Sequence, residues 1–166
     1  GSLDENMLAG SLMVITDHIN WSGFNPLIGK NDDRYGPRFS DMSDAYSKFY
    51  RNQLIEVANK KNQLIFQGVY CMYSGPNFET PAEIKAMKVL GGNAVGMSTV
   101  PEVIIANHCA LSVIAISVIT NLAAGMNKTK LSHQETLENS AFVEKNIFNL
   151  IKNFIQTIQF DDSTRN

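Results

Sequence analysis

The sequence predicts a single α/β domain in which a mixed, mostly parallel sheet is flanked by helices. Short apolar runs rich in β-branched residues alternate with segments of helical periodicity, which is the pattern of βαβ units. At 166 residues, the chain is long enough for one hydrophobic core and too short for two. We expect the domain to occupy residues 1–159 and residues 160–166 to form a flexible tail.

The first predicted strand covers residues 12–16, whose continuous apolar run is typical of a strand covered on both faces. Residues 17–42 follow with many Gly, Pro, Asn and Asp residues and no sustained period, so we expect a long loop. A loop of this length inside a compact domain is usually either functional or disordered.

A helix is predicted from Ser43 to the polar stretch at residues 59–62, and a second strand at residues 64–73. Five apolar or aromatic residues recur at helical spacing in the helix: Tyr46, Phe49, Tyr50, Leu54 and Val57.

Three capping boxes, each a Ser or Thr followed three residues later by Glu, predict the starts of the remaining helices. They lie at residues 80–83, 99–102 and 132–135. Short apolar strands are expected between them, at residues 93–98 and 111–120. The inner face of the last helix is predicted to carry Leu137, Ala141, Phe148, Ile151 and Ile155.

Composition excludes several function classes. The formal net charge is -2 and no basic patch stands out, so no nucleic-acid partner is expected. The longest apolar stretch, around residues 109–119, is too short to span a bilayer, and no segment resembles a signal peptide. Cys71 and Cys109 are interpreted as core residues. We therefore expect a cytoplasmic protein without a membrane partner.

Polar and aromatic residues gather where the predicted strands end. Because ligands bind at the carboxyl ends of parallel strands, these positions predict the site. They are Asp17 and His18, then Tyr70, Tyr73, Phe78 and Glu79, then residues 96–99, then Thr120 and Asn121, with His133 just beyond. A carboxylate, an amide, aromatic rings and hydroxyls together suit a flat polar ring next to a hydroxylated sugar.

Each residue also has a plainer interpretation when it is considered alone. Glu79 is equally explained as a solvated turn residue or as a charge favouring the next helix N-terminus. Asn121 after a strand is more often a turn former, and His133 is usually just a helix residue. The three histidines are too scattered to indicate a metal site.

Three long motifs identify a family. They read "GPNFETPAEI" at residues 75–84, "GGNAVGMSTVPEVIIANHCAL" at residues 91–111 and "ISVITNLAAGM" at residues 116–126. They resemble the trimeric, low-molecular-mass purine nucleoside phosphorylase family. The resemblance implies the nucleoside phosphorylase fold and a homotrimer. It also implies phosphorolysis of inosine and guanosine to free base and pentose 1-phosphate, with phosphate as co-substrate and no cofactor.

The resemblance also implies roles for single residues. Glu79 corresponds to the carboxylate that accepts the purine N1–H, and Asn121 to the amide that stabilises N7 and O6 of the departing base. The other residues that it assigns to substrate are Phe78 and Val95 at the base, Tyr70, Met97 and His133 at the sugar, Ser98 at the phosphate, and Thr120 beside Asn121. Phe39 corresponds to an aromatic that reaches the neighbouring subunit's sugar site.

Tyr73 bears on the preferred base. Members that accept xanthosine also carry Tyr at this place, and a phenol could donate to the 2-oxo group of xanthine. The resemblance therefore leaves hypoxanthine, guanine and xanthine open as the preferred base.

The resemblance covers only the C-terminal portion of the family chain. The family's Gly-rich phosphate loop, and an Arg and a His that bind phosphate, have no counterpart here, so we expect a fragment that is inactive by itself. A non-catalytic purine-binding or assembly module is the alternative function. The related methylthioadenosine phosphorylases carry Asp at the place of Asn121, which argues against that group.

Overall fold

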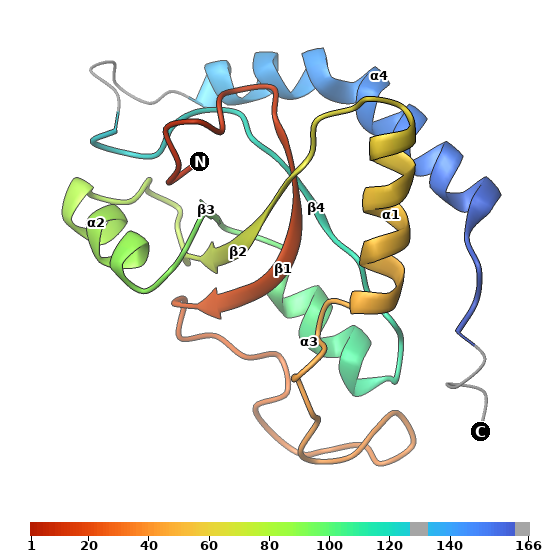
Figure 1. Ribbon diagram of the computed structural model, residues 1–166. Helices are drawn as coiled ribbons and strands as arrows, with labels where there is room; N and C mark the ends of the chain where they lie inside the picture. The colour runs from red at the N-terminus through yellow and green to blue at the C-terminus, as the bar shows by residue number, and fades with distance from the viewer. Residues whose placement is uncertain (127–132, 162–166) are drawn as a thin grey trace.

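A four-stranded sheet forms the centre of the molecule in the computed structural model, which describes residues 1–126 and 133–161 (Figure 1). In spatial order, its strands are β3 (Ala94–Gly96), β2 (Phe66–Met72), β1 (Leu12–Asn20) and β4 (Ile116–Val118). β2 pairs in parallel with both β1 and β3, whereas β4 runs antiparallel to β1. The predicted mixed, mostly parallel sheet is confirmed.

Two strands differ from their predicted extents. β1 continues past Thr16 to Asn20, because its pairing with β2 resumes after a register shift between Ile15 and Asp17. The polar residues there read as loop in the sequence, yet they occupy ladder positions. β4 is shorter than the apolar run at residues 111–120, because only Ile116, Ser117 and Val118 of that run pair with β1.

Helices cover both faces of this sheet. They are α1 (Lys48–Lys60), α2 (Pro81–Val89), α3 (Val100–His108) and α4 (His133–Thr157). In Figure 1, α1 and α4 pack together on one side of the sheet and α3 lies on the other. α1 begins after Ser47, whose hydroxyl accepts from the Tyr50 N–H, and not at Ser43 as predicted.

Side chains of β1 alternate between the two cores that this layering creates. Leu12 and Val14 are buried with residues of α1 and α4, whereas Met13 and Ile15 are buried with residues of α3. The continuous apolar run therefore indicates a strand covered on both faces, as the sequence predicted.

The inner face of α4 is a correction to the sequence prediction. Phe148, Ile151 and Ile155 were expected inside, but they are 62%, 40% and 64% exposed. The buried residues are instead Val143, Leu150 and Phe154, which pack with α1 and β1. The side chains of Leu137 and Ala141 fall outside the described residues.

The three predicted capping boxes have three outcomes. The box at residues 80–83 is confirmed: Thr80 accepts from the Glu83 N–H and the Glu83 carboxylate accepts from the Thr80 N–H. The box at residues 99–102 is wrong, because Thr99 has φ 76° and its side chain makes no cap hydrogen bond. The third opens at Ser132, which lies outside the described residues.

The first residues of the chain cover the outer side of β3. Ser2 bridges to Ala94 and to Leu122, and the Leu3 N–H donates to the Asn93 carbonyl. Gly1 is thereby held beside Val95, at the end of β3.

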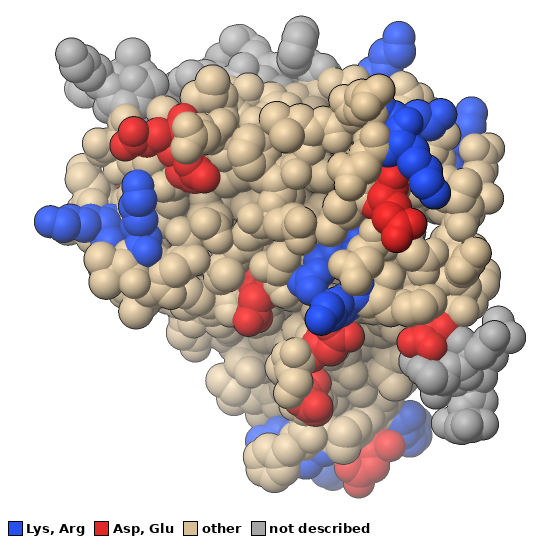
Figure 2. Space-filling model, in the orientation of Figure 1, with Lys and Arg blue, Asp and Glu red and all other residues tan. Residues whose placement is uncertain are grey.

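Charged side chains of both signs are interspersed on the face seen in Figure 2, with broad uncharged areas between them. None of the described helices combines the length and the hydropathy that a bilayer-crossing segment needs. Of the predicted tail, residues 162–166 lie outside the description, and the Asp161 N–H donates to the Tyr50 hydroxyl.

Candidate functional site

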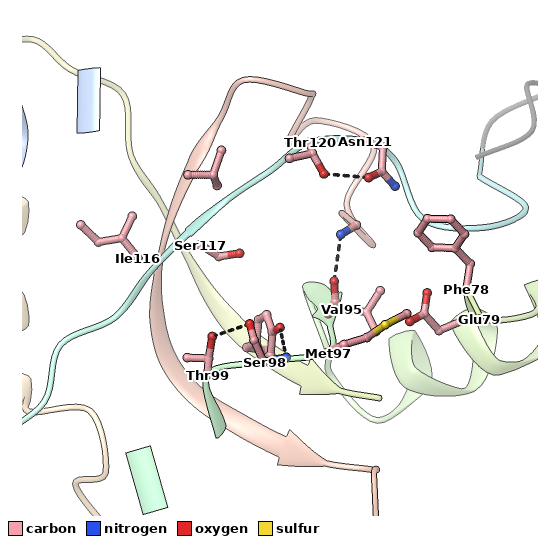
Figure 3. Close-up of a pocket in the computed structure, with 14 residues that line it drawn as sticks. Phe78, Glu79, Val95, Met97, Ser98, Thr99, Ile116, Ser117, Thr120 and Asn121 are labelled. Atoms are coloured by element: carbon pink, nitrogen blue, oxygen red, sulfur yellow. Dashed lines mark hydrogen bonds between the residues drawn. The ribbon is translucent and has the colours of Figure 1, made fainter. Parts of the chain in front are cut away.

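One cavity of about 400 Å³ opens where β2 and β3 end, beside the segment that follows β4 (Figure 3). Most of the residues predicted for the site line it: Tyr70, Phe78, Glu79, Val95, Met97, Ser98, Thr120 and Asn121. They come from four separate stretches of the sequence, so the fold brings the predicted strand-end residues together as expected.

Glu79 is buried, with 7% of its surface exposed, and lies in the wall of this cavity. Its position is fixed from behind, because the next residue, Thr80, is the N-cap of α2. Among the described residues, none donates a hydrogen bond to the Glu79 carboxylate. A buried carboxylate needs donors, so this geometry leaves its acceptor positions for a ligand.

Thr120 and Asn121 form a polar pair on the same cavity wall. The Thr120 hydroxyl donates to the Asn121 Oδ1 at 2.8 Å, and the Asn121 Nδ2 donates to the Leu122 carbonyl at 2.9 Å. An amide nitrogen carries two hydrogens, so one N–H of Asn121 is left for a ligand. Figure 3 shows Asn121 and Glu79 on either side of Phe78.

Apolar groups supply the rest of the wall around these polar atoms. Phe78 and Met97 are each 39% exposed, and Val95 is buried behind them. An aromatic ring, a thioether and a branched aliphatic side chain are suited to the faces of a flat ring.

Tyr70 and Ser98 meet at the end of β3. The Ser98 N–H donates to the Tyr70 hydroxyl at 3.4 Å, and Gly96 passes directly over that hydroxyl, leaving no room for a Cβ. Gly96 is therefore needed for the close approach of backbone and ring. Next to Ser98, the Thr99 hydroxyl lies 3.1 Å from the Ser98 hydroxyl.

The cavity carries little positive charge. Glu79 is the only Asp, Glu, Lys or Arg among the described residues that line it. The Gly1 ammonium also lies there and donates to the Val95 carbonyl at 2.8 Å. Burial lowers the pKa of this ammonium to about 6, and the nearby charge of Glu79 opposes the shift.

Among the predicted site residues, Tyr73 and Phe39 do not line the cavity, and neither do Asp17 and His18. Tyr73 packs beside α2, and its hydroxyl donates to the Glu83 carboxylate at 3.4 Å. Phe39 is 87% exposed and lines a second hollow, of about 430 Å³, together with His18 and Arg38. His133 begins α4, and its side chain lies outside the described residues.

Four residues that line the cavity were not predicted from the sequence: Gly1, Ile116, Ser117 and Val118. The three residues of β4 looked like core, because an apolar run gives no sign that one edge of the strand borders a cavity. For Thr99 the sequence predicted the wrong local structure, since its spacing from Glu102 matched a capping box. In the described part of the chain, no group of three or more His, Cys, Asp and Glu side chains could hold a metal ion.

Known proteins resemble this chain over nearly its whole length. Purine nucleoside phosphorylase 1 of Geobacillus stearothermophilus is 46% identical over 158 residues, which are 95% of this chain and 58% of that protein. Purine nucleoside phosphorylase 1 of Bacillus subtilis (strain 168) is 47% identical over 152 residues, which are 92% and 56% of the two chains. A solved Schistosoma purine nucleoside phosphorylase in complex with hypoxanthine has a TM-score of 0.92 at 34% identity, covering 96% of this chain and 60% of that one.

The chain thus spans less than two thirds of the length of each of these relatives. The phosphorylase superfamily matches residues 1–156 of this chain. That range contains the whole sheet and every described residue that lines the cavity. The chain belongs to the phosphorylase superfamily.

Proposed function

We propose that this protein takes part in the phosphorolysis of 6-oxopurine nucleosides, which yields free base and pentose 1-phosphate. Inorganic phosphate is the co-substrate, and no cofactor is required. The observation that carries the proposal is the buried Glu79 carboxylate, which has no donor among the described residues and shares one cavity with the Asn121 amide. The likeness to a phosphorylase structure that contains hypoxanthine supports the same base.

Glu79 selects the base by its charge. The N1–H of hypoxanthine or guanine donates to the carboxylate, whereas N1 of adenine is an acceptor and would face it without a proton. A hydrogen bond to a charged group contributes about 1.5–3 kcal/mol net, or roughly tenfold to a hundredfold in affinity. Phe78 and Val95 bound the faces of the ring, which keeps the ring edge directed at Glu79.

Asn121 stabilises the base as it leaves. Breaking the glycosidic bond places negative charge on the purine and positive charge on the sugar ring. The Asn121 N–H that is not donated to Leu122 can donate to N7, where the negative charge develops. Because this interaction strengthens as the bond breaks, it lowers the barrier and does not merely tighten binding.

The sugar and phosphate lie toward the end of β3. Tyr70 and Met97 border the sugar, Ser98 donates to the phosphate, and we assign His133 to the sugar hydroxyls by family resemblance. The phosphate, below the ring, stabilises the positive charge of the sugar in the transition state and then bonds to its anomeric carbon.

The working assembly is a homotrimer in the cytoplasm. Phe39 is 87% exposed on the loop that follows β1, which suits an aromatic that closes the sugar site of a neighbouring subunit. In this proposal Tyr73 extends the accepted bases to xanthine. Its hydroxyl would have to leave Glu83 to reach a 2-oxo group, because it now donates to that carboxylate.

A second candidate function is purine binding without catalysis. It is favoured by the absence of any Lys or Arg among the described residues that line the cavity, since a phosphate dianion needs cationic or multiple N–H partners. The two candidates share the base pocket and differ in turnover with inosine and phosphate.

Calorimetric titration with hypoxanthine and adenine tests the shared pocket. We expect hypoxanthine to bind at least tenfold more tightly than adenine. Glu79→Gln should shrink that preference, because an amide can donate to adenine N1 as well as accept from N1–H. Glu56→Gln, on the exposed side of α1, is the matched control and should change neither affinity. Equal affinity of the unaltered protein for both bases would refute the proposal.

A further inference from the structure

The residue between β3 and α3 has an unusual backbone. Thr99 has φ 76° and ψ -52°, and the Val100 N–H donates to the Ser98 carbonyl at 2.8 Å. A hydrogen bond from residue i+2 to residue i around a central φ near +75° defines the strained form of the γ-turn. A β-branched residue at positive φ is a genuine outlier, and such strain clusters at functional sites.

Both ends of this turn are fixed by the surrounding structure. Before it, the Ser98 N–H donates to the hydroxyl of Tyr70, which is 4% exposed. After it, Val100 is completely buried in the core beneath α3. The chain must cover the distance between these two anchors with Thr99 alone, which is how the strained conformation persists.

The turn determines which backbone N–H groups remain available to a ligand in the cavity. It commits the Val100 N–H to the Ser98 carbonyl, and Pro101 has no N–H to offer. Among the described residues, no acceptor pairs with the Thr99 N–H. The hydroxyls of Ser98 and Thr99 lie 3.1 Å apart, and both residues line the cavity. Figure 3 marks this contact with a dashed line.

We infer that Thr99 is a positioning residue for the phosphoryl group. Its strained turn holds the Ser98 hydroxyl and the Thr99 N–H toward one point of the cavity rim, and its own hydroxyl orients the hydroxyl of Ser98. This inference rests on the proposed function, because it assigns the phosphate side of the same cavity. A glycine would adopt this φ without strain, so what the threonine adds here is its hydroxyl and the rigidity that its branching gives.

Three substitutions of Thr99 distinguish the effect of its hydroxyl from the effect of its backbone conformation. Thr99→Ser keeps the hydroxyl, Thr99→Val keeps the shape and the branching without the hydroxyl, and Thr99→Gly removes both while fitting the turn. The probes are ribose 1-phosphate and hypoxanthine, each titrated calorimetrically into the intact chain, with the thermal unfolding midpoint measured for every variant.

We expect Thr99→Val to weaken ribose 1-phosphate about fivefold, Thr99→Gly at least tenfold, and Thr99→Ser less than twofold. Hypoxanthine affinity should stay within twofold throughout, and Thr99→Gly should unfold at no lower temperature than the unaltered chain. A merely structural Thr99 would change both ligands in parallel with the unfolding temperature.

The possible failures are distinguishable. If the unaltered chain binds neither probe, the proposed function fails. If it binds hypoxanthine but not ribose 1-phosphate, or if Thr99→Val and Thr99→Gly bind ribose 1-phosphate as the unaltered chain does, the proposed base site stands and the role of Thr99 is overturned.

Discussion

The amide of Asn121 is held in place by its immediate neighbours in the sequence. Its Oδ1 accepts from the Thr120 hydroxyl and its Nδ2 donates to the Leu122 carbonyl. The two bonds define which end of the amide carries nitrogen and which carries oxygen. We therefore expect Thr120 to act on a bound base through Asn121.

Replacing Thr120 with Val should weaken hypoxanthine binding about twofold to tenfold, because one neutral hydrogen bond that orients Asn121 is lost. Thr120→Ser keeps the hydroxyl and should bind as the unaltered chain does. Calorimetric titration of both variants measures the effect. Equal losses in the two would show that the methyl group of Thr120, and not its hydroxyl, is what matters.

His18 should make the free energy of unfolding depend on pH. Its Nδ1 lies 2.9 Å from the hydroxyl of the buried Tyr46, and burial lowers the pKa of the imidazole, opposed by the charge of Asp17. The unfolded chain therefore binds a proton at His18 at a higher pH than the folded chain does. The free energy of unfolding should fall as pH is lowered from about 7 to about 5.

Chemical denaturation at several pH values, with His18→Asn as the comparison, isolates this contribution. The variant should lose part of the slope over that range, and the Gly1 ammonium should account for some of what remains. An unchanged slope in His18→Asn would mean that His18 has the same proton affinity in both states.

Tyr73 shows that the residue types at a strand end do not indicate to which face of the sheet each side chain points. The sequence placed Tyr70 and Tyr73 together at one strand end, but residues three apart on an extended chain point to opposite faces of a sheet. Tyr70 accordingly lines the cavity, and Tyr73 packs beside α2. Glu79 and Asn121 both line the cavity, and each lies several residues beyond the end of its strand, where the turn sets the direction of the side chain.

At the scale of elements, two helix starts with the same sequence signal behave differently. Thr80 forms a capping box with Glu83, whereas Thr99 caps nothing and bonds to Ser98. The motif specifies which residues can cap. The path of the chain between Tyr70 and the core beneath α3 decides that Thr99 does not, and a local pattern contains no information about that path.

Thr80→Ala should lower the free energy of unfolding by about 1 kcal/mol, because the Glu83 N–H loses its cap. Thr99→Ala is the matched control and removes no cap hydrogen bond. Denaturant titration of the two variants compares them directly. A loss at Thr99 as large as that at Thr80 would contradict the difference between the two helix starts.

The face of α4 could not be chosen from periodicity. Phe148, Ile151 and Ile155 have helical spacing, and so do Val143, Ile147, Leu150 and Phe154. Both stripes fit one helix, and contact with α1 and β1 buries the second. The existence and type of every helix followed from the sequence, whereas the orientation of α4 depended on its tertiary contacts.

At the scale of the whole molecule, β4 is an edge strand of the sheet and also borders the cavity. β4 pairs with β1 alone among the described strands, and its three residues also line the cavity. The wall there consists of Ile116, Ser117 and Val118, with no cationic group. This wall therefore suits the proposed purine base better than it suits the proposed phosphate.

We predict that this chain alone does not turn over inosine with phosphate above the uncatalysed rate, although it binds hypoxanthine. The reason is that Ser98, Thr99 and their backbone cannot replace the several donors that a phosphate dianion requires. A coupled assay for released hypoxanthine measures this. Robust turnover by the isolated chain would show that the described cavity is already sufficient for catalysis.

The most direct measurement of the central claim is a crystal structure of the chain with hypoxanthine bound. We predict the purine between Phe78 and Val95, with N1 within hydrogen-bond distance of the Glu79 carboxylate and N7 within that distance of the Asn121 amide. A purine bound in the hollow beside Phe39 and His18, or one that touches Glu79 but not Asn121, would contradict it.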